Sequence, residues 1–430
     1  RRAIEWITAI GLALNCRVTP VSVFHRKNYF YADLPKNYQI SQYDIPVCHD
    51  GWLEVEVDGE LVWVGIERAH MEEDTGKSLH VGAGGRIHAA RATLLDFNRS
   101  GVPLVEIVSR PDLRTPEQAR AYAQQLRALV AALGVSDTRL EEGSIRFDAN
   151  VSVRPQGDQA LGVKVEIKNM NSFRSLERAL AYEIERQVEA LEAGGEVVQE
   201  TRHWDEQAGV THGMRTKEGS SDYRYFTEPD LVPMAVDEAW LERVGAGLPE
   251  LPGRRKARYL ELGLDPHAAG VLVSADDRLR DLFEEALGAG SEPRAAANWV
   301  TGEVTAYLRR EDVSLDDTPL TGPHLAQLTG MVAAGTLSAS AAREVLAGVL
   351  AGEGTPQEVA AARDLIQVSD ASVLEQEVEA VLAAHPDEVG RIRAGEQKLV
   401  GFLVGQVMRA TGGKADPRTV NELLRVRLGG

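Results

Sequence analysis

The sequence has few residues of the types that mark zinc-binding, disulfide-bonded or membrane proteins. Its 430 residues include two cysteines, Cys16 and Cys48, and their spacing matches no zinc motif. We therefore expect reduced thiols and a reducing, cytosolic setting. The sequence also lacks any run of 18 apolar residues, so we expect no segment that spans a membrane.

The charge is acidic overall but changes sign near the end of the chain. A net charge of −18 argues against indiscriminate binding to nucleic acids. Residues 351–390 contain 9 acidic and 1 basic side chains, a net charge of −8. Residues 391–430 contain 8 basic and 3 acidic side chains, a net charge of +5. This local reversal indicates a polyanionic partner for the tail of the chain.

Strand and helix patterns alternate over the first half of the chain. Apolar alternation on both sides of Asp58-Gly59 predicts a hairpin with strands at 52–57 and 61–66. Thr115, followed by proline and glutamate, is a typical helix start. Residues 173–192 have the apolar spacing of an amphipathic helix.

The sequence pattern changes at LPELPG, residues 248–253. Beyond this segment the spacing of apolar residues is helical almost throughout. The segment GEGTPQE at 352–358 predicts a second linker. We predict an α+β protein in three parts. These are a largely antiparallel β-sheet cradle domain with flanking helices at 1–245, an all-α helical domain at 250–350 and a small all-α tail domain at 357–430.

The segment RAHMEEDTGK, residues 68–77, concentrates charge and a histidine. Either it is a solvated acidic turn, or it is a loop that handles a metal ion or phosphate. Glu106, in VPLVEIV, lies on an apolar strand face, so its carboxylate needs a salt bridge, a hydrogen bond or a metal ion. Several carboxylates together favour Mg²⁺, which prefers hard oxygen ligands.

Two further strands carry polar residues on one face. In SIRFDANVSVRP, Asp148 and Asn150 share the polar face, and Glu166 and Lys168 do so in the next strand. This face is either solvated or lines a cleft, and its mixed charges and amides favour the cleft. The segment DYRYF at 222–226 suits either base stacking and phosphate binding or the edge of a core.

Seven segments occur in the order FHRKNYFYADLPKNYQISQYD, RAHMEEDTGKS, LLDFNRSGVPLVEIVSRPD, EEGSIRFDANVSVRP, VEIKNMNSF, QETRHWDE and DYRYFTEPDLVP. They closely resemble the GatB family, which supplies one subunit of the tRNA-dependent amidotransferases. The tail segments GFLVGQVM and GKADPRTVNELL resemble the YqeY-like tail of the same family. The resemblance covers essentially the whole chain.

The resemblance implies an ATP- and Mg²⁺-dependent enzyme subunit of the cytoplasm. It would convert Glu-tRNA(Gln) to Gln-tRNA(Gln), or Asp-tRNA(Asn) to Asn-tRNA(Asn). ATP would phosphorylate the side-chain carboxylate of the mischarged aminoacyl group. Ammonia from an amidase subunit, GatA, would then displace phosphate, and a small subunit, GatC, would complete a heterotrimer. The helical tail would contact tRNA.

The resemblance also implies roles for particular residues. Glu73 and Glu106 match acids of a Mg²⁺ site. Lys27 would offset phosphoryl charge, and Asp148 would position or deprotonate ammonia. Residues expected to orient the loop are His70, Glu72 and Asp74. Residues expected to contact tRNA phosphates are Arg391, Arg393, Lys398, Arg409, Lys414 and Arg418.

The chain departs from the family pattern at three places. Ala32 and Thr227 stand where the family usually has proline, and both look like loop changes. The chain also starts without the family's opening strand, which supplies a glutamate and a histidine to the metal site. We therefore expect that an N-terminal segment is missing from this sequence.

Two other functions fit parts of the pattern. A non-catalytic tRNA-binding scaffold would need the basic tail but not the acids of the cradle. A stand-alone Mg²⁺-dependent kinase of a small acid would need the acids but not the basic tail. Mixed-sign polar strand faces favour the amidotransferase over the scaffold.

Overall fold

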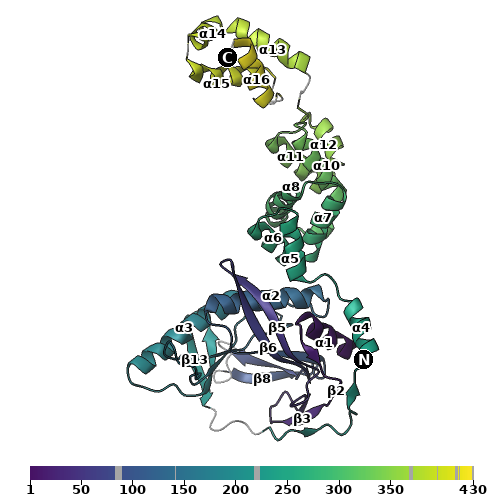
Figure 1. Cartoon of the computed structure of the whole chain (residues 1–430), viewed down its shortest axis with the longest axis vertical. Coiled ribbons are helices and arrows are strands. Elements are labelled where there is room, and N and C mark those ends of the chain that lie inside the picture. The colour runs from purple at the N-terminus through teal and green to yellow at the C-terminus, as the bar shows by residue number, and fades with distance from the viewer. Residues whose placement is uncertain are drawn as a thin grey trace. The chain divides into compact units, whose positions relative to one another are not determined.

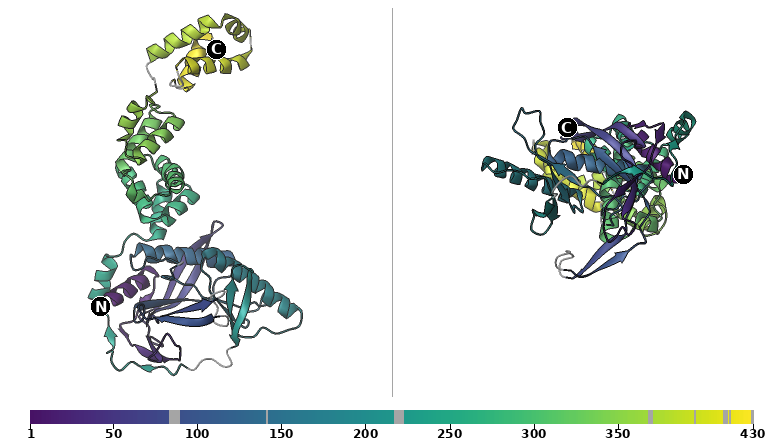
Figure 2. Two further views of the ribbon diagram at one scale, coloured as in Figure 1. Left: turned by 180° about the vertical axis from the view of Figure 1, so that it is seen from behind. Right: turned by 90° about the horizontal axis from the view of Figure 1, so that it is seen from below.

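A computed structural model describes residues 1–82, 90–140, 142–216, 223–367, 371–394, 396–411, 415 and 417–428 (Figures 1 and 2). The chain divides into two compact units, Arg1–Arg254 and Arg255–Gly430. In the described part of the chain, no helix has both the length and the apolar character needed to cross a membrane.

The largest sheet of the first unit is antiparallel throughout and has the order β1-β5-β6-β9. Its strands are β1 (Arg17–Val18), β5 (Cys48–Val57), β6 (Glu60–Glu73) and β9 (Pro103–Ser109). The predicted hairpin at Asp58-Gly59 is confirmed, since both residues have the positive φ of a tight two-residue turn, 52° and 84°. Strand β6 is longer than predicted and runs through the whole of RAHMEE.

Two helices cover this sheet. They are α1 (Arg2–Ala13) and α2 (Pro116–Ala132). Thr115 caps α2 as predicted, because its side chain accepts a hydrogen bond from the backbone N–H of Gln118. Side chains from both helices form one apolar cluster with the buried side chains of β5 and β6. The cluster also contains Cys16, which precedes β1, and Cys48 of β5, and both cysteines are free and buried. This cluster anchors the strands that carry the site.

A second sheet has the order β10-β11-β12-β13, with one parallel pair, β11 and β12. Its strands are β10 (Ala149–Val151), β11 (Val165–Lys168), β12 (Glu200–Asp205) and β13 (Val210–Thr216). Helix α3 (Phe173–Glu192) has the predicted bounds and packs against it through Ala179, Ile167 and Trp204. The predicted apolar face of β10 and β11 is confirmed by this core, so the polar residues face the other way.

Smaller sheets and a helix complete the first unit. Three strands have the order β14-β3-β4, and two further pairs are β15 with β2 and β7 with β8. Their bounds are β2 (Val21–Ser22), β3 (His25–Asn28), β4 (Tyr38–Ser41), β7 (Lys77–Gly82), β8 (Ala90–Asp96), β14 (Phe226–Thr227) and β15 (Met234–Ala235). The helix is α4 (Glu238–Ala246). With largely antiparallel sheets followed by helices, the predicted α+β class is confirmed.

The second unit is helical in its described residues and contains two separate apolar clusters. The first cluster joins α5 (Pro252–Glu261), α6 (Pro266–Ser274), α7 (Asp277–Gly288), α8 (Pro293–Asn298), α10 (Gly322–Ala333), α11 (Ala339–Leu350) and α12 (Pro356–Ala362). A π-helical segment, Trp299–Val304, leads into α9 (Thr305–Glu311). The second cluster joins α13 (Ala371–Ala384), α14 (Pro386–Arg393), α15 (Val400–Ala410) and α16 (Pro417–Leu428).

The two apolar clusters of the second unit can be compared with the predicted boundary between the helical domain and the tail. Val359 and Ala360 of α12 are buried with the first cluster, whereas the prediction assigned this helix to the tail at 357–430. A hydrophobic core groups helices by burial, and a glycine-rich segment alone does not show on which side a short helix packs. The division into three domains stays a prediction.

Candidate functional site

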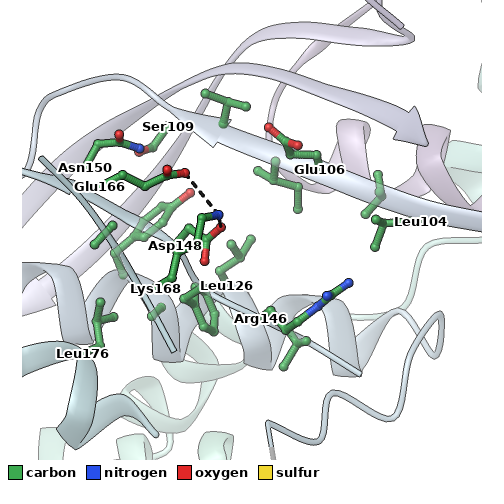
Figure 3. A pocket seen from close by; sticks show the side chains of 18 of the residues that line it. Leu104, Glu106, Ser109, Leu126, Arg146, Asp148, Asn150, Glu166, Lys168 and Leu176 are labelled. Carbon is green, nitrogen blue, oxygen red and sulfur yellow. Dashed lines mark hydrogen bonds and ion pairs between the residues drawn. The ribbon is translucent and has the colours of Figure 1, made fainter. Parts of the chain in front are cut away.

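The first unit contains a cavity of about 2470 Å³. Strands from three sheets and helix α2 line it. Figure 3 shows Glu106 of β9 on one wall, and Asp148, Glu166 and Lys168 together on another. A large cavity with convergent charged side chains is the usual form of a binding site.

The pairing of β6 with β9 decides which acids face this cavity. His70 lies directly opposite Glu106, so their side chains share a sheet face. Glu72, two residues along the strand, shares that face. One ligand atom from each of these three residues lies within 4.8 Å of the others. The strand pairing therefore assembles two carboxylates and one imidazole.

Glu72 is the most constrained member of this group, at 7% exposed. Its carboxylate accepts hydrogen bonds from Ser41 Oγ at 2.9 Å and from Gln39 Nε2 at 3.0 Å. Lys27 Nζ and His70 Nε2 each lie 3.4 Å from the same carboxylate. Burial raises the pKa of Glu72, but His70, Lys27 and Ser41 outweigh it and bring the pKa down to about 2. Glu72 is therefore ionised at neutral pH.

The donor set fits a divalent cation. His70 is 3% exposed, and its Nδ1 atom has no hydrogen-bond partner among the described residues. An unsatisfied buried ring nitrogen is unfavourable unless something else binds it. Glu106 is exposed to the cavity and carries a second carboxylate. Two carboxylates suit Mg²⁺ or Mn²⁺, and an imidazole adds affinity for the transition metal.

The structure differs from the prediction on the acid that faces Glu106. Glu73 lies on the opposite face of β6, where it accepts from Lys36 Nζ and from the backbone N–H of Ile40 at 2.8 Å. Because side chains alternate along a strand, neighbouring glutamates cannot both face Glu106. His70 and Glu72, predicted as loop-orienting residues, take the place predicted for Glu73.

Asp74 has contacts that hold the loop after β6. Its carboxylate lies 3.0 Å from Arg99 Nε and 3.4 Å from Arg146 Nη2. It also accepts a hydrogen bond from the backbone N–H of Thr75 at 3.0 Å. The orienting role of Asp74 stays a prediction.

Across the cavity, Lys168 joins two carboxylates of the second sheet. Its Nζ atom lies 2.5 Å from Asp148 Oδ2 and 3.2 Å from Glu166 Oε1 (Figure 3). Burial lowers the pKa of Lys168, but Asp148 and Glu166 outweigh it and raise the pKa above its usual value. Asp148 therefore lies in the cavity as predicted, next to a positive charge that keeps its carboxylate paired.

Comparison with known proteins identifies the family. Residues 1–242 match the family model "GatB/GatE catalytic domain", and residues 281–428 match "GatB domain". The chain belongs to the GatB family of amidotransferase subunits.

Two relatives illustrate the extent of the match. The GatB subunit of the aspartyl/glutamyl-tRNA(Asn/Gln) amidotransferase from Thermosynechococcus vestitus is 50% identical over 99% of this chain and 86% of its own length. The protein of the same name from Moorella thermoacetica is 50% identical over 100% of this chain and 89% of its own length. The predicted resemblance to GatB is confirmed over both the cradle and the tail.

The tail of this GatB chain has exposed basic residues in its described part. Arg393, Lys398, Arg409 and Arg418 are exposed. Arg391 is also exposed but is held by Glu396, with Nη2 at 2.6 Å from the carboxylate. The other predicted phosphate contact, Lys414, lies outside the described residues. The contact of the tail with tRNA stays a prediction.

Three partners of Glu72 and Glu73 were not predicted from the sequence: Gln39, Ser41 and Lys36. These residues lie on or next to β4, which pairs with β3 and contacts β6. Their polar types are common in exposed loops, so no local signal sets them apart. Strand β4 pairs with β3, which is close in the sequence, but its contact with β6 joins residues about 30 positions apart and is non-local.

Proposed function

We propose that this chain activates the side-chain carboxylate of a mischarged aminoacyl-tRNA and converts it to an amide. In the first step a carboxylate oxygen of the aminoacyl group attacks the γ-phosphorus of ATP, and ADP leaves. In the second step ammonia attacks the carbonyl carbon of the acyl phosphate, inorganic phosphate leaves, and the nitrogen loses a proton. The products are the amidated aminoacyl-tRNA, ADP and phosphate.

The observation that carries the proposal is the cluster of His70, Glu72 and Glu106, two of which, Glu72 and Glu106, line a large cavity. These residues would hold Mg²⁺. When bound, the ion supplies positive charge that offsets the charge of the transferring phosphoryl group. Two carboxylates and a buried imidazole, whose Nδ1 has no hydrogen-bond partner among the described residues, are the donor set that this chemistry needs.

Other side chains of the same cavity support the transfer. Lys27 Nζ lies 3.4 Å from Glu72 and also lines the cavity, so its charge is available beside the cation site. Lysine stabilises phosphoryl oxygens as a point charge. Asp148 is held by Lys168, and we assign it the positioning of ammonia on the opposite wall.

Partners follow from the names of the relatives and from the family resemblance. We propose that the chain works in a heterotrimer with GatA, the amidase, and GatC, a small protein. The substrates would be Glu-tRNA(Gln), Asp-tRNA(Asn) or both, as in the names of the relatives. The exposed basic residues of the tail would contact tRNA phosphates without reading sequence. We propose a cytoplasmic location, in keeping with this role in translation.

The test is transamidation by the reconstituted heterotrimer with each mischarged tRNA, ATP and Mg²⁺. We expect Glu106→Gln to lower the rate of ADP formation and of amide formation by about 100-fold or more. Its matched control is Glu60→Gln, an exposed acid at the start of β6, which should retain full activity. Affinity for tRNA should be equal in all three proteins.

The same experiment tests the scaffold alternative. A non-catalytic tRNA-binding protein would support transamidation equally well with Glu106→Gln and with the unchanged chain. Equal rates would therefore refute the site and favour the scaffold. Deleting the tail distinguishes the stand-alone kinase, because the amidotransferase would then lose tRNA affinity, whereas a small-acid kinase would keep its activity.

A further inference from the structure

Tyrosine is unevenly distributed in this protein. Five of its ten tyrosines form a continuous row beside the cavity. Consecutive ring centroids are 5.7, 6.2, 6.0 and 4.5 Å apart. The order of the rings is Tyr31, Tyr29, Tyr223, Tyr225 and Tyr43. Rings in contact over such a distance form one rigid surface.

The two ends of this row differ in what they face. Tyr31 is 68% exposed and lines the cavity. Tyr43 is 58% exposed, stacks on Tyr225 with an angle of 16° between the ring planes, and is not among the described residues that line the cavity. Because Tyr31 is mostly exposed, its ring remains accessible to a ligand in the cavity.

A chain of contacts connects Tyr31 with the cation site. The Tyr31 ring packs edge-on against Tyr29, whose hydroxyl donates to Gln39 Oε1 at 3.1 Å. Gln39 Nε2 in turn donates to Glu72 Oε2 at 3.0 Å. Tyr29 is thus held at both its ring and its hydroxyl, and it fixes the edge against which Tyr31 rests. The exposed ring therefore has a defined position relative to Glu72.

We propose that Tyr31 is the stacking platform for an adenine base whose phosphates lie at the His70, Glu72 and Glu106 cluster. An aromatic ring binds a purine through its face, and a nearby cation site binds the phosphates of the same ligand. The inference rests on the proposed function, because it gives the nucleotide of that reaction a place in the cavity. Two adenosines enter the reaction: that of ATP and the 3′-terminal adenosine of the aminoacyl-tRNA.

The variants are Tyr31→Ala, Tyr31→Phe and, as matched control, Tyr43→Ala, all in the heterotrimer. We measure the dissociation constant of ATP by equilibrium dialysis, with inorganic tripolyphosphate as a probe that lacks the base. We also measure the affinity for aminoacyl-tRNA and for the same tRNA shortened by its terminal adenosine. These measurements do not depend on turnover.

We expect Tyr31→Ala to weaken the binding of ATP by at least about 5-fold, as loss of a stacking ring does. Tyr31→Phe and Tyr43→Ala should bind like the unchanged chain, and tripolyphosphate should bind all variants equally. A loss confined to ATP assigns the platform to the nucleotide. A loss confined to aminoacyl-tRNA would overturn the proposal, because the base would then belong to a ligand whose phosphates do not lie at the cation cluster.

The proposal is overturned if Tyr31→Ala binds ATP as tightly as the unchanged chain does. It is also overturned if Tyr43→Ala matches the loss, or if tripolyphosphate is weakened as much as ATP. These outcomes differ from failure of the proposed reaction. If the unchanged heterotrimer forms no amide but Tyr31→Ala still weakens ATP selectively, the platform stands and the reaction assignment fails.

Discussion

Replacing Glu72 by glutamine should make the free energy of unfolding of the first unit less dependent on pH. The pKa of Glu72 is about 2, against 4.5 for an ordinary glutamate. The difference corresponds to about 3 kcal/mol of folding free energy at neutral pH. Because the folded-state pKa is depressed, this contribution is fully present above pH 4.5 and is lost as the pH falls towards 2.

Glutamine has the shape of a protonated glutamate without its charge. We therefore expect Glu72→Gln to lower the free energy of unfolding by about 3 kcal/mol at pH 7. At pH 3 the unchanged chain has already lost about 2 kcal/mol of this contribution, so the difference should shrink to about 1 kcal/mol. His70, Lys27 and Ser41 supply the interactions that glutamine weakens.

The assay is urea unfolding followed by tryptophan fluorescence, with a chelator present to remove metal ions. Five of the six tryptophans lie in the first unit, so the signal reports on it. Glu60→Gln, the exposed control on the same strand, should unfold like the unchanged chain at both pH values. A destabilisation by Glu72→Gln that is equal at pH 7 and pH 3 would refute the reasoning, because it would show that the charge is not its source.

Two further outcomes follow from the strand faces and the helix cap. Titration calorimetry with Mn²⁺ should show at least about 10-fold weaker binding for Glu106→Gln and less than about 2-fold change for Glu73→Gln; the reverse order would contradict the placement of the two acids. Thr115→Ala should lower the free energy of unfolding by about 1 kcal/mol in the urea assay, because the backbone N–H of Gln118 loses its acceptor, while Thr115→Ser should restore it. Equal stability of the alanine and serine variants would rule out the cap.

Local patterns predicted most of the individual elements. Helix α3 has the predicted bounds, and the hairpin at Asp58-Gly59 forms where two turn residues follow an alternating strand. Both features depend on periodicity and turn chemistry, which a short segment carries by itself. The family resemblance also follows from sequence alone, because its motifs are contiguous.

The sequence could not show which acid of RAHMEE faces Glu106. A shift in the register between β6 and β9 lies between Ile66 and Arg68. Before it, Val64 and Ile66 are buried in the core, and after it Ala69 and Met71 are. At this shift the buried residues of β6 change from even-numbered to odd-numbered positions. Alternation counted along the sequence from Val64 therefore assigns the residues after the shift to the wrong faces of the strand.

The sequence by itself determined the α+β class, the helix and hairpin positions, the family and the set of charged residues from which a site could be built. The tertiary structure decided which of these residues meet. Glu72 faces Glu106 because β6 pairs with β9, about 30 residues further along the chain. Lys27 and Ser41 lie together beside Glu72 because β3 pairs with β4. Such pairings depend on non-local packing, since each strand selects its partner by the faces that the whole core buries.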